Sequence, residues 1–178
     1  MTSLLRFLGI GNTAAKHASA ETQTVRRIAE KLERLTPEKA KYLAAFAFVL
    51  ARAAHADLRI DDAETEIMQD IAREIGGLDA GEASLVVEIA KSQARLLGGT
   101  ENYVVTREFR CNSTPEQRVR LLQCLYAVAA ADGSISSIES GEIANIAEEL
   151  GFTPAEANAL RSPYRDKLSV LQNLPQPD

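Results

Sequence analysis

The chain has 178 residues and a net charge of −5, from 20 Lys and Arg against 25 Asp and Glu, which argues against a nucleic-acid-binding protein because such proteins usually present a basic surface. Two Cys and two His leave little room for a zinc finger or a disulfide scaffold. With 28 Ala, 5% aromatic residues and no Trp, the composition favours closely packed helices over a sheet.

Residues 1–20 show no sustained hydrophobic period, and we expect a flexible lead there. Arg6 interrupts the apolar run at the start and no basic region precedes it, so a signal peptide is not expected. Peripheral contact with a membrane stays open through the apolar side chains of this segment. These side chains are Leu4, Leu5, Phe7 and Leu8.

No membrane-spanning segment is expected. The longest uncharged apolar runs, residues 42–51 and 121–131, are too short to cross a bilayer and fit buried helices instead. Cys124 lies at helical spacing within the second run and is expected in the core. Cys111 is expected in a loop, and two free thiols fit a reducing compartment, so the expected location is the cytoplasm.

Four helices are expected in the first half of the chain. Thr36, Pro37 and Glu38 combine an N-cap, a proline suited to the first helical position and an acid at the positive end of the helix dipole. Glycine pairs at 76–77 and 98–99 close two of the helices. The helices are expected over residues 25–35, 37 to about 56, 62–75 and 85–97.

The second half begins with a break in the pattern. Residues 103–106 have the composition of a strand, but one short strand cannot form a sheet, so residues 100–113 are expected to form a connecting loop. Three helices should follow, and Ser162-Pro163 should kink or split the last one. They are expected over residues 115–131, 137–150 and 154–171, before a frayed tail at 173–178.

An internal repeat is the strongest signal in the sequence. A shift of 75 residues places residues 56–64 over 131–139 without a gap, and it also pairs Gly76 with Gly151. We interpret this as a duplicated unit of helix, acidic corner and helix. The predicted fold is therefore all-α, with about seven helices in two pseudo-symmetric repeats that form a single domain over residues 21–172.

The shared corner reads Asp-x-x-Ile-x-x-x-Glu. Asp132, Gly133 and Glu139 match the second half of a calcium-binding EF-hand loop. The first half of that loop would fall on Val128 and Ala130, whose side chains carry no oxygen ligand. One such corner cannot complete a calcium cage, so a true EF-hand is not expected.

Two corners together can still form a metal site. If the repeats pack about a two-fold axis, Asp57, Glu64, Asp132 and Glu139 converge, and four facing carboxylates repel unless a cation neutralises them. Such hard oxygen ligands suit Ca²⁺, Mg²⁺ or Mn²⁺. Further candidate ligands near the first corner are His55, Asp61 and Asp62.

A purely structural interpretation of the corners stays open beside the metal site. In it each Asp accepts backbone N–H bonds, each Ile enters the core, and Glu64 and Glu139 complete capping boxes. Other features carry less chemistry. The mixed charges and thiol of residues 107–111 lack a paired His for a Cys nucleophile, and the basic residues of 26–34 are typical of a solvated helix face.

The residues of the two corners resemble a known family. Residues 126–139, YAVAAADGSISSIE, and their counterpart 53–64, AAHADLRIDDAE, are similar to the TerB family of bacterial tellurite-resistance proteins, whose fold resembles the N-terminal domain of the co-chaperone DjlA. The resemblance covers residues 38–160. One departure is Leu58-Arg59, which stands where the second copy has Gly133-Ser134 and places a cation beside the first corner's acids.

This resemblance implies a bacterial all-helical module with an acidic surface that binds a metal ion at Asp57, Glu64, Asp132 and Glu139. It also implies a role in stress response through protein partners. We expect no catalytic residues, no enzymatic activity and no nucleic-acid partner. The alternative is a metal-free helical adaptor for protein partners, similar to a co-chaperone. A hydrolase with the carboxylates as acid and base lacks a substrate-positioning group.

Overall fold

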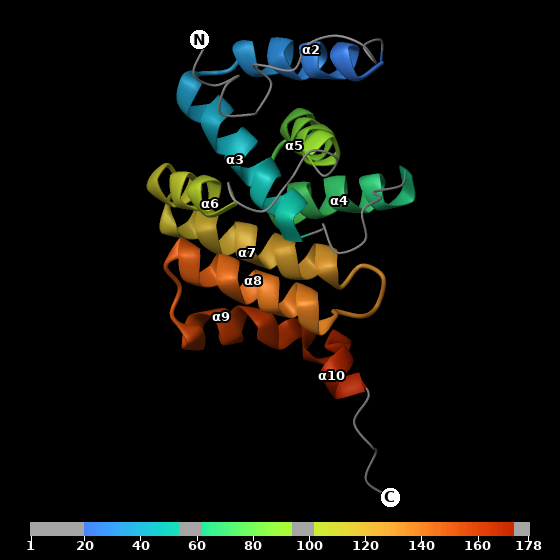
Figure 1. The fold of residues 1–178 in the computed structure, drawn as a ribbon, viewed down its shortest axis with the longest axis vertical. Coiled ribbons are helices and arrows are strands. Elements are labelled where there is room, and N and C mark those ends of the chain that lie inside the picture. The colour runs from blue at the N-terminus through green and yellow to red at the C-terminus, as the bar shows by residue number, and fades with distance from the viewer. Residues whose placement is uncertain (1–19, 54–61, 94–101, 173–178) are drawn as a thin grey trace, which may run out of the picture.

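The chain is all-helical, as the sequence predicts. The computed structural model describes residues 20–53, 62–93 and 102–172, and every structural statement below concerns these residues. They form nine α-helices and one 3₁₀-helix, labelled in Figure 1. The helices are α2 (Ala20–Glu33), α3 (Pro37–Ala53), α4 (Asp62–Glu74), α5 (Ala80–Gln93), α6 (Asn102–Cys111), α7 (Pro115–Ala129), α8 (Ser137–Leu150), α9 (Pro154–Arg161), η2 (Ser162–Lys167) and α10 (Ser169–Gln172).

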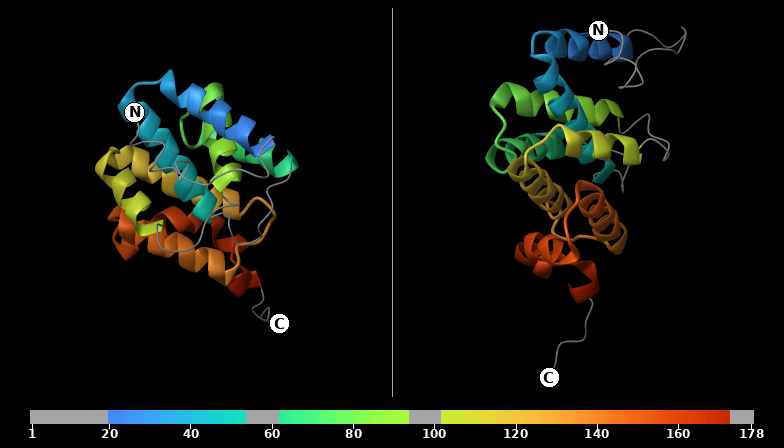
Figure 2. Two further views of the ribbon diagram at one scale, coloured as in Figure 1. Left: turned by 45° about the horizontal axis from the view of Figure 1, so that its top comes forward. Right: turned by 90° about the vertical axis from the view of Figure 1, so that its left-hand side faces the viewer.

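The helices are stacked along the long axis of the molecule. Helix α2 lies across one end, α7, α8 and α9 follow one another in layers, and α10 lies at the other end (Figure 1). The right-hand view in Figure 2 shows α2 at the top of the molecule and α9 and α10 at the bottom. Helix α3 runs obliquely through the upper part and packs against α5, α6, α7 and α8, so it connects the upper helices with the lower layers.

Helix α3 is the centre of the core. Every residue from 42 to 51 is buried, which means that the helix is covered on all sides. Large side chains such as Leu43, Phe46 and Leu50 fill the space between helices, and buried alanines let the neighbouring backbones approach. The buried alanines in this stretch are Ala44, Ala45, Ala47 and Ala51. The alanine-rich composition is thus used at the core.

Capping residues begin the helices where the sequence predicts. Thr114, Ser136 and Thr153 each accept a hydrogen bond from the backbone N–H three residues later, and the Glu or Gln at that position accepts one in return. Asp79 and Glu82 exchange the same pair of hydrogen bonds at the start of α5. Each such box satisfies N–H groups that have no partner within the helix.

The expected loop over residues 100–113 is wrong, because residues 102–111 form helix α6. Val105 and Phe109 lie one turn apart and are buried, and Phe109 packs against Tyr42 of α3 with 5.3 Å between the ring centroids. The β-branched residues in this segment have modest helix propensity, but burial of this face against α3 outweighs that preference. Arg107 and Cys111, expected in the loop, lie on α6 as well.

Other boundaries differ by smaller amounts. Helix α5 begins at Ala80, earlier than expected, because Asp79 supplies an N-cap that the hydrophobic pattern does not include. The last predicted helix is split at Ser162-Pro163, as expected, since α9 ends at Arg161 and a 3₁₀-helix follows. The lead at 1–19 and the tail at 173–178 lie outside the described residues.

The two halves agree with the 75-residue shift along α4 and α8 but not at their ends. The shift carries Asp62–Glu74 onto 137–149, almost the whole of α8. It also pairs Gly76 with Gly151, yet the glycine with positive φ that follows α4 is Gly77, at 69°, whereas the one that follows α8 is Gly151, at 89°. The first copy therefore has one extra residue after α4. The pseudo-symmetric packing of the halves and the limits of the domain stay predictions.

Two further sequence predictions concern the cysteines and the membrane. Cys124 is fully buried, and this burial raises the pKa of its thiol to about 12, whereas Cys111 is exposed; both are free thiols. Among the described residues, no helix is both long enough and apolar enough to cross a membrane.

A pair of glycine substitutions tests the ends of α8. Gly151→Ala should lower the free energy of unfolding by about 1–2 kcal/mol, because a β-carbon is disfavoured in the left-handed conformation. The added carbon would also lie 2.7 Å from Cζ of Arg110. Gly141→Ala is the matched control within the same helix. Nothing lies within 4 Å of its new β-carbon, so urea unfolding should show a gain of about 0.5–1 kcal/mol. Equal effects would contradict this reading of Gly151.

Candidate functional site

The second acidic corner is a tight turn between α7 and α8 in which Asp132 holds the backbone. Its Oδ1 accepts a hydrogen bond from the backbone N–H of Ser134 at 3.0 Å. Gly133 adopts a φ of 96°, and its N–H donates to the carbonyl oxygen of Ala130 at 3.0 Å. Asp132 itself is exposed. The short side chain of Asp132 thus stabilises the turn by accepting a hydrogen bond from the backbone two residues later.

The corner is anchored to the core and to the C-terminal segment. Ile135 is 1% exposed and carries the turn into the core. Its N–H donates to the carbonyl of Lys167 at 2.6 Å, and its carbonyl accepts from the N–H of Ser169 at 2.9 Å. The amide of Gln172 donates to the carbonyl of Gly133 at 3.1 Å. We call residues 167–169, which form the two backbone bonds, the C-terminal strap.

Glu139 closes the corner as half of a capping box. Its Oε2 accepts a hydrogen bond from the N–H of Ser136 at 2.8 Å, and its own N–H donates to the Ser136 hydroxyl at 3.2 Å. A carboxylate in the first turn of α8 is also favoured by the helix dipole. Both acids of this corner therefore have a structural task.

The four predicted metal ligands are only partly within the described residues. Asp132 and Glu139 occupy the second corner, and Glu64 lies exposed in the first turn of α4. Asp57, with the neighbouring candidates His55 and Asp61, lies outside the described residues. Within 20–53, 62–93 and 102–172, no three His, Cys, Asp or Glu side chains are grouped to hold a metal ion. The convergence of the four carboxylates stays a prediction.

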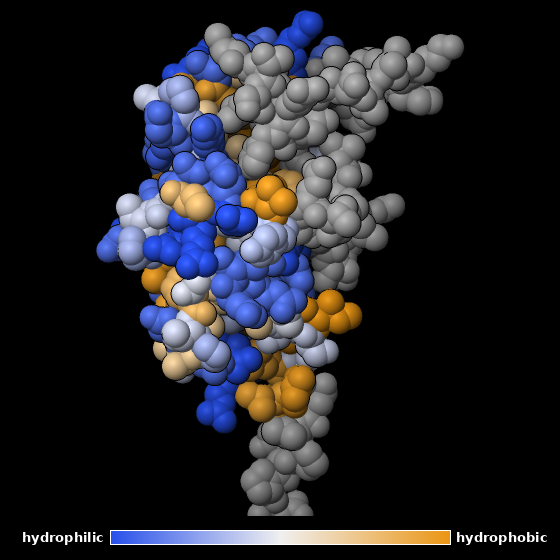
Figure 3. All heavy atoms as spheres, turned by 60° about the vertical axis from the view of Figure 1, so that its left-hand side comes forward, coloured by the Kyte–Doolittle hydropathy of each residue, from blue (hydrophilic) through white to orange (hydrophobic). Residues whose placement is uncertain are grey.

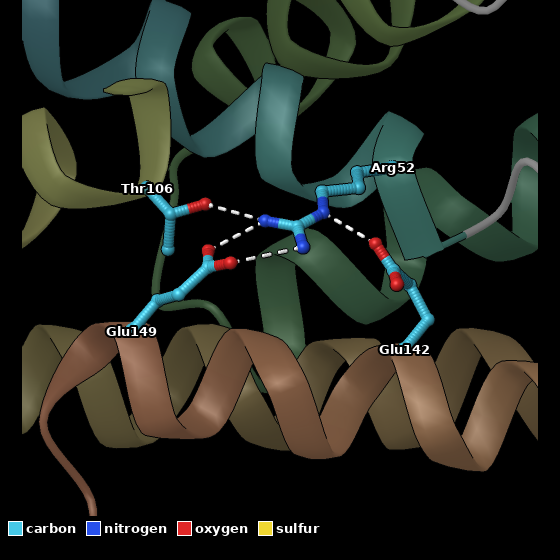
Figure 4. Close-up of polar contacts among 4 residues, drawn as sticks. All are labelled: Arg52, Thr106, Glu142 and Glu149. Atoms are coloured by element: carbon cyan, nitrogen blue, oxygen red, sulfur yellow. Dashed lines mark hydrogen bonds and ion pairs between the residues drawn. The ribbon is translucent and has the colours of Figure 1, made fainter. Parts of the chain in front are cut away.

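A buried arginine between two glutamates is the charged cluster that the sequence analysis missed. Arg52, near the end of α3, reaches Glu142 and Glu149 on α8 and Thr106 on α6 (Figure 4). Its guanidinium binds both carboxylate oxygens of Glu149, at 2.5 Å and 3.1 Å. Its Nε donates to Glu142, and a second bond from Nη1 reaches the Thr106 hydroxyl at 3.1 Å.

The electrostatics of this cluster favour a charged Arg52. The arginine side chain is 8% exposed, and Glu149 is 16% exposed. Burial by itself lowers the pKa of Arg52, but the hydrogen bonds that it donates to Glu149 and Glu142 outweigh this effect, so the pKa lies above its usual value. A bidentate arginine–carboxylate ion pair is among the stronger charged contacts in proteins. The cluster therefore ties α3 to α8 and α6.

The sequence held a weak signal for this cluster. Glu142 and Glu149 are two helical turns apart, so they lie on one face of α8, and Arg52 is the cation in the last turn of α3. Nothing in the sequence connects residues that are 90 and 97 positions apart. What this cluster can do chemically is neutralise the charges of Arg52, Glu142 and Glu149 against one another between α3 and α8.

The sequence of this chain matches the profile of one protein family. Residues 43–162 match the profile of the family described as tellurite resistance protein TerB. The chain belongs to the TerB family. No match was found among curated proteins or among solved structures. The TerB match begins within α3 and ends at the start of η2, so it contains the second corner and the Arg52 cluster. Helix α2 and the C-terminal strap lie outside it.

Replacement of Arg52 tests whether the cluster holds α3 to α8. Arg52→Met should lower the free energy of unfolding by about 3 kcal/mol, because two partly buried glutamates lose their cation. The matched control is Arg73→Met, which breaks an exposed pair with Asp70 and should cost less than about 0.5 kcal/mol. Urea unfolding at pH 7 measures both. A deficit of Arg52→Met equal to that of Arg73→Met would contradict the role given to Arg52.

Proposed function

We propose that this TerB-family chain is a non-enzymatic interaction module of the response to tellurite and related stress, and that its second corner serves the fold without a resident cation. The observation that carries the second part is the Glu139 carboxylate, which accepts the backbone N–H of Ser136 and caps α8. An acid at this position is accounted for by helix capping.

The surroundings of the corner support the same proposal. Asp132 accepts the N–H of Ser134, so its charge is also used locally. Farther along α8, the acids Glu142 and Glu149 have the cation they need in Arg52. These four acids are thus engaged by backbone amides or by an arginine. This is a pattern of structural stabilisation rather than of acid–base chemistry.

The role of the chain as an interaction module is supported by its exposed surface. On the face in Figure 3, apolar side chains stand in small patches between hydrophilic ones. Five large apolar side chains of the described residues are exposed. They are Ile67, Tyr103, Val104, Ile138 and Val170. Exposed apolar side chains of this kind are available for reversible contacts with protein partners.

A second candidate function is the binding of Ca²⁺, Mg²⁺ or Mn²⁺ by both corners together. The hydrogen bonds given above use one oxygen each of Asp132 and Glu139, which leaves the other oxygen of each as a possible ligand. A hard divalent cation needs more oxygen ligands than these two residues supply. Asp57 and Glu64 of the first corner would have to complete the site.

Two substitutions of Glu139 separate capping from metal binding. Glutamine keeps the capping hydrogen bond but removes the charge, so Glu139→Gln should change the free energy of unfolding by less than about 0.5 kcal/mol. Glu139→Ala should cost about 1 kcal/mol because the cap is lost. Calorimetric titration with Ca²⁺, Mg²⁺ and Mn²⁺ should give no binding heat with any of these proteins. Binding to wild type that disappears in Glu139→Gln and Asp132→Asn would establish the metal site instead.

Growth in tellurite tests the stress-response role separately. Expression of the chain in a tellurite-sensitive bacterium should raise the tolerated tellurite concentration, and Glu139→Gln should protect equally well because it leaves the fold intact. The empty vector is the control. Growth that does not differ between the chain and the vector would contradict this role.

A further inference from the structure

Helix α2 is attached to the TerB domain at one end of the molecule. It packs against α5 and α3 and lies across the end opposite to α10 (Figure 1). The TerB match begins at residue 43, so α2 lies outside the family domain. The surface of α5 that α2 covers, in contrast, lies within the matched residues.

A single acid on α5 holds two cations of α2. Glu88 accepts hydrogen bonds from Nε of Arg27 at 2.6 Å and from Nζ of Lys31 at 2.9 Å. The two cations are four residues apart, so they lie on the same face of α2. The Glu88 side chain is 15% exposed. Burial raises its pKa, but the bonds from Lys31 and Arg27 outweigh this, and the net pKa is lowered.

Apolar side chains next to these cations complete the contact. Ile28 and Leu32 follow Arg27 and Lys31 directly in sequence, and they are 2% and 3% exposed. Like the cations, they are four residues apart, on an adjoining face of the helix. Helix α2 therefore presents an apolar row beside a cationic row.

Helix α5 needs a cover on the side where α2 lies. Leu85, Val86 and Val87 are buried although they are consecutive, as are Ile89 and Ala90. Consecutive residues of a helix point in different directions, so α5 must be covered over most of its circumference, while Ser84, Glu88 and Lys91 are half-buried. Helices α3 and α4 pack against it as well, and α2 covers part of the remaining surface. Without α2, the chain would expose Glu88 and the apolar surface that Ile28 and Leu32 cover.

We propose that this surface of α5, which we call the α5 surface, is the docking site for a basic amphipathic helix of a protein partner, and that α2 occupies it in the free chain. The inference deepens the proposed interaction role and rests on it. The partner helix would carry two cations four residues apart beside two large aliphatic side chains, because this is the pattern that fits Glu88 and its apolar surroundings in α2.

The attachment of α2 suits a cover that can be displaced. A turn of three residues, 34–36, joins it to α3. A helix of 14 residues is marginal by itself in water, so α2 depends on its contacts with the domain. Those contacts include the partly buried Glu88 and the two buried aliphatic side chains described above. A partner helix with the same pattern would compete for each of them.

A peptide added in trans tests the α5 surface. A full-length variant with Ile28→Asp and Leu32→Asp should release α2 and leave the α5 surface open. A fluorescent peptide with the wild-type sequence of residues 20–35 should bind this open variant about tenfold more tightly than it binds wild type, as measured by fluorescence anisotropy. Equal affinity for both proteins, or no binding to the folded open variant, would overturn the proposal.

Charge reversal identifies the site of binding. Glu88→Arg in the open variant should weaken binding of the peptide about tenfold or more. A peptide with Arg27→Glu and Lys31→Glu should regain binding to that protein. Asp166→Arg, at a 74% exposed acid, is the matched control and should leave binding unchanged. Loss of binding in the control as well, or no rescue by the charge-reversed peptide, would overturn the assignment to Glu88.

Hydrogen exchange on wild type keeps the proposal testable if the open variant fails to fold. Backbone amides of α2 should exchange about 100-fold faster than those of residues 43–50 in α3, because α2 opens without the core. Equal protection would show that α2 leaves only on global unfolding and would overturn the proposal. So would a wild-type dimer formed by exchange of α2, since the α5 surface would then bind a second copy of the chain. Metal titration and tellurite growth do not enter these tests, so failure here is distinguishable from failure of the proposed function.

Discussion

The structure depends on helix α3, which is buried on every side over residues 42–51 and carries the charged Arg52 in its last turn. Residues 42–51 of α3 are buried, so the other helices must surround it, and Arg52 follows directly after them. A buried guanidinium is costly unless acids neutralise it, which requires α8 to bring Glu142 and Glu149 to the end of α3. The other helices pack around the apolar stretch, while the ion pairs of Arg52 determine which face of α8 is turned toward α3.

Local signals in the sequence were sufficient for most helix boundaries. Thr114 and Thr153, each followed by Pro and, three residues on, by Gln or Glu, mark helix starts because capping chemistry involves only neighbouring residues. Helix α6 could not be predicted in the same way. Its helical state depends on burial of Val105 and Phe109 against α3, and no property of residues 100–113 alone contains that contact.

The same distinction between local and long-range contacts applies to the candidate site. The capping by Glu139 and the turn formed by Asp132 follow from short sequence spacing, and both could be anticipated as one of two interpretations of the corner. The partnership of Arg52 with Glu149 could not, since it joins residues 97 positions apart. Convergence of Asp57 with Asp132 is a long-range property of this second kind, and sequence spacing alone does not determine it.

The C-terminal strap has a consequence for where the folding unit ends. The TerB match stops at residue 162, before the strap at 167–169 that satisfies the N–H and the carbonyl of the buried Ile135. A fragment trimmed to the matched residues would leave both backbone groups of Ile135 without those partners. It would also lack α2, which packs against α5 and carries the buried Ile28 and Leu32. The stretch that matches the family is therefore shorter than the stretch of this chain that is packed together.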